Sequence, residues 1–212
     1  MKRSILVFLG FLVAFSIACG WFDDDVTNIS YTETVPVGFP INADALCPGD
    51  AGCGEETVES PADQPLLPIK NGVDLDIIEL TGNKELKKFV GVFRSIEITS
   101  IGYETKANDL SFDLPPMKLY LGPLGATSPN DDGVFELTTI PEIVAGTNKV
   151  GDAPVSEASR AATNDLFQQL RFATVLYAKP VVKKGQSFPP KGSTDLNLKL
   201  QIKFTANPQD AL

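Results

Sequence analysis

Apolar and polar residues alternate most clearly near the C-terminal end of the chain. Leu196, Leu198, Leu200, Ile202 and Phe204 occupy every second position, and the residues between them are polar. Because the side chains of a strand point alternately to opposite faces, this pattern predicts a strand with one buried face and one solvated face.

Residues 170–182 form a second segment rich in β-forming residues. They are joined to the alternating segment by residues 183–193, which include Gly185, Pro189 and Pro190. We expect the two segments to pair as an antiparallel hairpin with a long loop.

Shorter alternating segments lie upstream. One of them changes phase at Ser100, and a β-bulge there would keep Ile98 and Ile101 on the same buried face. About seven short strands separated by turn-forming residues predict a mainly β fold, an antiparallel β-sandwich of the immunoglobulin-like or a related type. The remaining predicted strands are 73–77, 110–114, 117–121 and 134–139.

Two segments carry a helical pattern. Residues 83–89 are short and basic, which predicts one or two helical turns at the surface. In residues 155–169, apolar residues recur at helical spacing from Val155 to Leu166. We expect this segment to be one α-helix docked on the sandwich. The alternative is a helix that binds a partner or a membrane surface, but its only basic residue is Arg160.

The charge distribution separates an acidic leader from the predicted domain. The whole chain has a net charge of −9; residues 19–70 contain ten acidic residues and one basic residue, whereas residues 71–212 contain seventeen and fifteen. The acidity therefore belongs to the leader and not to the domain. Nucleic acid is disfavoured as a partner because phosphate contacts need a positive surface.

The leader is also rich in proline, which predicts a disordered tether over residues 19–71. Within it, residues 31–37 favour a strand, but Pro36 restricts that strand to the edge of a sheet. We expect the sandwich domain to cover residues 72–206 and a short tail to cover residues 207–212.

The N-terminus has the layout of an export signal. A short basic end precedes thirteen uncharged residues, from Ile5 to Ile17, and Ala18 and Cys19 follow. Small residues ahead of a cysteine resemble the processing site of bacterial lipoproteins. The resemblance implies that residues 1–18 are a signal peptide that is removed, and that Cys19 is acylated and anchors the protein to a membrane.

Two other interpretations of the N-terminus remain open. An ordinary signal peptidase could cut after Ser16-Ile17-Ala18, and residues 5–22 are just long enough for an uncleaved membrane anchor. All three interpretations place the domain outside the cytoplasm. Gly20 stands where enteric bacteria place an inner-membrane retention signal, an aspartate, so the resemblance favours the outer membrane.

The chain has three cysteines. Five small or turn-forming residues separate Cys47 from Cys53, so in an oxidising compartment we expect these two to form a disulfide. Cys19 is then the odd cysteine, as lipidation requires. A metal site is the alternative for the pair, but the chain has no histidine to complete it. We therefore expect no metal and no cofactor.

Motifs for catalysis are missing from the sequence. Without histidine, the usual general base for a serine or cysteine nucleophile is absent, and no phosphate-binding loop or nucleophile elbow occurs. Asp74 and Asp76 share a strand face and could act as a carboxylate pair, but an exposed polar face is the simpler interpretation.

Two surface features are candidates for binding a partner. Tyr120 lies on the strand face opposite to Met117, Leu119 and Leu121, although a second packed sheet layer would use it equally well. The loop 179–191 is the other candidate, and a solvated loop tip is its alternative interpretation. Its candidate residues are Lys183, Lys184, Phe188 and Lys191, which suit an acidic protein or a polysaccharide.

These observations predict a non-catalytic, lipid-anchored protein of the cell envelope that binds a partner or supports envelope or surface structure. One alternative is a carboxylate- or metal-dependent enzyme acting on polysaccharide, which requires two buried acids in a cleft. The other is an accessory protein that holds a lipid or another apolar ligand in a cavity between the sheets.

Overall fold

The computed structural model describes residues 28–48, 56–156 and 170–207, and between the last two ranges Ser159, Thr163 and Leu166. Within these residues, no helix is both long enough and apolar enough to span a membrane.

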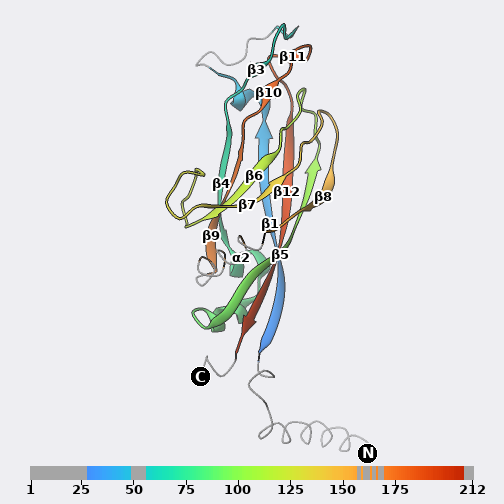
Figure 1. The fold of residues 1–212 in the computed structure, drawn as a ribbon. Helices are drawn as coiled ribbons and strands as arrows, with labels where there is room; N and C mark the ends of the chain where they lie inside the picture. Colours follow the sequence, from blue (N-terminus) through green and yellow to red (C-terminus); the bar gives the residue numbers. More distant parts are fainter. Residues whose placement is uncertain are drawn as a thin grey trace, which may run out of the picture.

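The structure is a sandwich of two four-stranded antiparallel sheets (Figure 1). The first sheet has the order β1 (Ile29–Asn42), β12 (Ser193–Ala206), β5 (Phe93–Lys106) and β8 (Val150–Ala153). The second has the order β4 (Ile69–Asp76), β9 (Arg171–Ala178), β6 (Met117–Gly122) and β7 (Phe135–Ile140).

Two short ribbons lie at one end of the sandwich. In one, β2 (Val58–Glu59) pairs with β11 (Ser187–Phe188), and in the other β3 (Gln64–Pro65) pairs with β10 (Val181–Val182).

The strand order defines the topology. Numbered along the chain, the eight strands of the two large sheets are ordered 1-8-3-6 and 2-7-4-5. This is the order of a jelly roll, a sandwich of two interleaved Greek keys. The predicted antiparallel β-sandwich is therefore confirmed, with a jelly-roll order in place of the immunoglobulin order.

The two long strands with the clearest patterns are as predicted. The five alternating apolar residues of β12 are each at most 1% exposed. The bulge in β5 is also present, because Gln201 pairs with Ser100 whereas Ile202 pairs with Ile98. Thr99 is therefore the extra residue, and Ile98 and Ile101 are both fully buried.

The predicted hairpin between residues 170–182 and β12 is wrong. β9 pairs with β4 and β6 in the second sheet, whereas β12 pairs with β1 and β5 in the first. Phe172 and Ala173, which point to opposite faces of β9, are both fully buried. Burial on both faces suits a central strand, and the long loop has the length needed to cross from one sheet to the other.

The predicted boundary of the domain at residue 72 is also wrong, because β1 and β4 belong to the sandwich. β1 pairs with β12 along its whole length, and it lies at the edge of its sheet, as expected for 31–37. The carbonyl of Pro40 accepts a hydrogen bond from Asn71 at 3.0 Å on the side away from β12. Pro36 lies four residues earlier and faces the same way, so neither proline removes a bond from the β1–β12 ladder.

Other expectations were met in part. Residues 110–114 form no strand, although Leu114 makes an isolated bridge to Ile143. The basic segment is the 3-10 helix η3 (Lys84–Phe89), as predicted. β8 and two short helices, α2 (Ile77–Thr81) and η2 (Ala43–Leu46), were not predicted.

The predicted docked helix is described at three positions. Ser159, Thr163 and Leu166 are helical, and Leu166 and Val155 pack against the core. The Ser159 hydroxyl donates to the Glu136 carbonyl and the Thr163 hydroxyl to the Ile96 carbonyl, at 3.2 and 3.4 Å. These bonds attach this segment to β7 and to β5. The rest of residues 157–169 lies outside the described residues.

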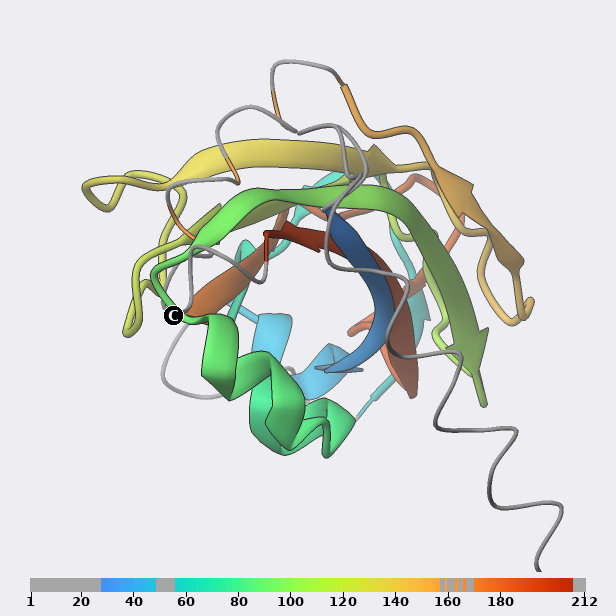
Figure 2. The ribbon, with the colours of Figure 1, turned by 90° about the horizontal axis from the view of Figure 1, so that it is seen from below.

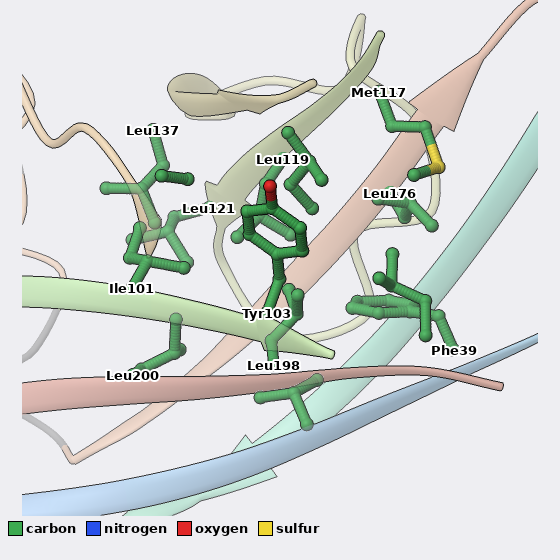
Figure 3. Packing of buried hydrophobic residues seen from close by; sticks show 14 of the residues in the cluster. Phe39, Ile101, Tyr103, Met117, Leu119, Leu121, Leu137, Leu176, Leu198 and Leu200 are labelled. Atoms are coloured by element: carbon green, nitrogen blue, oxygen red, sulfur yellow. The ribbon is translucent and has the colours of Figure 1, made fainter. Parts of the chain in front are cut away.

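Side chains from both sheets meet in one core (Figure 3). Phe39, Leu198 and Leu200 come from the first sheet, and Met117, Leu119 and Leu176 come from the second. At the lower end of the molecule the strands of the first sheet continue past the second sheet (Figure 1). The helices α2 and η3 lie at this end beside β1 (Figure 2).

Candidate functional site

The two ends of the sandwich differ in the chain segments that they bring together (Figure 1). β1 begins at Ile29 beside α2 and η3, and we call this end of the sandwich the proximal end. It finishes at Asn42, which pairs with Ser193 near the loop 179–191; this loop and its two ribbons form the distal end. A strand of this length spans about 45 Å.

The loop at the distal end is held by backbone contacts and is not a free tip. Ser60 and Gln186 are joined by a backbone hydrogen bond of 2.9 Å, and the Lys184 amide donates to Asp63 Oδ1 at 2.9 Å. The Lys191 amide donates to the Ser111 hydroxyl at 2.8 Å.

Lys183 forms two ion pairs between this loop and the rest of the domain. Its Nζ lies 2.8 Å from Asp113 Oδ2 and 3.4 Å from Glu142 Oε1. A hydrogen bond from the Ala145 amide, followed by the one from Lys183, lowers the pKa of Asp113. The same carboxylates raise the pKa of Lys183. Lys183 thus ties the loop to the rest of the domain, and both of its partners come from distant parts of the sequence.

The other predicted residues of this loop differ in exposure. Lys184 and Lys191 have exposed side chains, whereas Phe188 is half-buried and packs against the core. Phe188 pairs with Val58, which is 58% exposed. The distal end therefore presents two lysines and an exposed valine on a fixed support. Their role in binding stays a prediction.

Tyr120 lies away from this loop, on the outer face of the second sheet. It is half-buried against a small apolar cluster that includes Ala126 and Val175, and this burial raises the pKa of its phenol. Ala126 belongs to the connection between β6 and β7, which covers the sheet here. Tyr120 packs under this connection and not against a second sheet layer, and its role in binding a partner stays a prediction.

A groove lies at the proximal end, where the sequence predicted no site. It has a volume of about 680 Å³, and we call it the α2–η3 groove. Gly82 ends α2 in the left-handed conformation, and Asn83 then caps η3 by accepting the Glu85 amide, so the two helices meet at a bend. The principal residues that line the groove are Ile78, Glu79, Lys84, Lys87, Val90 and Arg171.

The candidate carboxylate pair has structural partners. Asp76 accepts the amides of Ile78 and Glu79 as the N-cap of α2, and it pairs with Arg171 at 3.3 Å. Asp74 accepts the Gly125 amide at 2.8 Å. No carboxylate is buried among residues 28–48, 56–156 and 170–207, and these ranges contain no cluster of acidic or cysteine side chains suited to a metal ion.

Only one of the three cysteines, Cys47, lies among the described residues. Cys47 is buried at 5% exposure directly after η2. Cys53 and Cys19 lie outside the described residues, so both the disulfide and the acylation site stay predictions.

No protein-family model and no curated protein matches the chain. Among solved structures, the BFDV capsid protein in its 60-mer is 10% identical with a TM-score of 0.33, and the match covers 85% of this chain and 96% of that one. A chain of the Macrobrachium rosenbergii nodavirus particle is 11% identical with a TM-score of 0.30, covering 87% and 97%. A chain of Desmodium yellow mottle tymovirus is 11% identical with a TM-score of 0.26, covering 88% and 94%. Similarity this low carries no argument about function.

Proposed function

We propose that the protein is a non-catalytic, lipid-anchored component of the bacterial cell envelope, on the outer membrane, and that its distal end binds a partner. The observation that carries the proposal is the position of β1. Only nine residues separate Cys19 from Ile29, where β1 begins. An extended chain of nine residues spans about 30 Å, so an anchor at Cys19 keeps the proximal end close to the membrane.

The distal end lies at the other end of β1, about 45 Å away along the strand. Its exposed groups include Lys184, Lys191 and Val58, next to a loop that Lys183 holds in place, and the acidic residues Glu59 and Asp63 are exposed there too. A fixed surface loses little conformational entropy on binding. Two exposed lysines beside an apolar residue suit an acidic protein or a polysaccharide.

The anchor is tested by mass spectrometry of the mature N-terminus. We expect Cys19 to be the first residue and to carry two or three acyl chains. Cys19→Ser should move the protein from the detergent phase to the aqueous phase. An unmodified Cys19, or an intact Met1, would defeat the proposal.

The binding surface is tested by photo-crosslinking in cells. A crosslinking residue at position 184 or 191 should give a discrete adduct. The same residue at position 203, an exposed lysine position on the outer face of β12 near the proximal end, is the control. Equal adducts at the distal positions and at position 203 would contradict a distal binding surface.

A further inference from the structure

The α2–η3 groove is lined by three basic and two acidic residues, and one of the basic residues, Arg171, is paired with Asp76. Among the described residues, the side chains of Lys84 and Lys87 have no ion-pair or hydrogen-bond partner, whereas the neighbouring Lys88 pairs with Glu85. Apolar side chains, Ile78 and the 43% exposed Val90, line the same groove. The groove therefore suits an occupant that combines apolar groups with negative charge.

A segment of this composition precedes β1. Residues 21–25 read Trp-Phe-Asp-Asp-Asp, two aromatic residues followed by three carboxylates. Trp21 is the only tryptophan of the chain.

The chain between this segment and β1 is short, and β1 contacts the helices that form the groove. The Tyr31 ring of β1 lies 6.2 Å from the Phe89 ring of η3, and Asn83, at the bend between the helices, donates to Glu33 at 2.5 Å. Three residues separate Asp25 from the start of β1, and three extended residues span about 10 Å. A tether of this length gives an effective concentration on the order of millimolar, which favours this segment over untethered ligands of similar chemistry.

We propose that residues 21–25 dock in the α2–η3 groove, with the aromatic rings against the apolar lining and the carboxylates beside Lys84 and Lys87. Glu79 lines the same groove and opposes the aspartates, so the two lysines are required for docking. Docking would fix the direction in which the leader leaves the domain. The proposal does not depend on acylation of Cys19, so it stands or falls independently of the proposed function.

An anionic membrane surface would also attract these lysines. However, the three aspartates lie between Cys19 and the domain, and they would be repelled by anionic head groups. The leader itself is therefore the occupant that charge and proximity favour, and membrane insertion of Trp21 is an outcome that the experiment must separate from docking.

Trp21 fluorescence tests the proposal in the chain from residue 19 onward, with Cys19→Ser so that no acyl chain contributes. In detergent-free buffer we expect emission at shorter wavelength than that of a free indole in water, with weak quenching by acrylamide. The charge reversal Lys84→Glu with Lys87→Glu should shift the emission to longer wavelength and raise quenching several-fold. Added salt should act in the same direction because it screens exposed charges.

The matched control is Lys179→Glu with Lys184→Glu, which makes the same change of charge at the distal end. It should leave the emission unchanged, and circular dichroism should show that both variants fold. Combining the Lys84 and Lys87 reversals with Asp23→Lys and Asp24→Lys should restore the short-wavelength emission. Emission typical of free indole in the unmodified leader, or emission that changes only when lipid vesicles are added, would overturn the proposal.

Discussion

Lys183 Nζ lies 2.8 Å from Asp113 Oδ2, and this pair joins the loop 179–191 to the segment before β6 across 70 residues of sequence. The sequence suggested a solvated loop tip, whereas this contact holds the loop against the rest of the domain. It also places a carboxylate of lowered pKa where its protonation state affects the fold.

Asp113→Asn should therefore reduce stability by about 1 kcal/mol, because an amide keeps one hydrogen bond but loses the charge. The pKa of Asp113 is lower in the folded state, so its contribution is present above the unfolded value of about 4 and is lost as the pH falls through the folded pKa. Urea unfolding between pH 6 and pH 2 measures this effect. The variant should lose less stability than the parent over that range; equal losses would show that the pair does not matter.

Gly192→Ala should be strongly destabilising, by more than about 2 kcal/mol. Gly192 has a φ of +93°, and a Cβ there would overlap the carbonyl of Asp109. Gly185 is the matched control, since its φ is +84° but a Cβ would meet open space. Gly185→Ala should cost only about 1 kcal/mol, and the prediction fails if the two substitutions shift the thermal midpoint equally.

Leu86→Ala should destabilise the domain by about 2–4 kcal/mol, because Leu86 is 1% exposed and attaches η3 to the core. Lys87→Ala, one residue later on the exposed side, should change stability by less than about 0.5 kcal/mol. Chemical denaturation of both variants tests whether η3 is part of the cooperative fold. A small effect of Leu86→Ala would mean that η3 packs only loosely.

The disulfide between Cys47 and Cys53 should be found in exported protein. An alkylating reagent added under denaturing, non-reducing conditions should label neither cysteine, and labelling should appear after reduction. Closing so small a loop stabilises the fold by about 2 kcal/mol on the chain-entropy model, so reduction should lower the thermal midpoint modestly. Free thiols at both positions before reduction would contradict the pairing.

Sequence pattern was sufficient where local periodicity and burial agree. The alternation in β12 and the phase change at Ser100 each depend on one strand having one buried face, and both were predicted correctly. Phe172 to Ala178 carries no such signal, because both faces of β9 are largely buried. The partner strands of β9 therefore depend on tertiary contacts that the sequence pattern does not show. The strand that follows it in the predicted hairpin, β12, was the wrong partner.

The prolines of β1 obscured the domain boundary for a related reason. Val35, Val37, Phe39 and Ile41 alternate as regularly as the residues of β12, and all four are buried. Pro36 and Pro40 occupy the intervening positions and made the segment resemble a tether. The groove at the proximal end was not predictable either, since Lys84 and Arg171 come together only in the folded chain.

The same two prolines have a consequence for crowded copies of the protein. An edge strand with free amides on its outer side is a template on which a second chain can add a strand. Pro36 and Pro40 have no amide hydrogen on the outer side of β1, so a neighbouring copy finds an incomplete row of donors there. The β1 edge of the first sheet is thereby protected against strand addition.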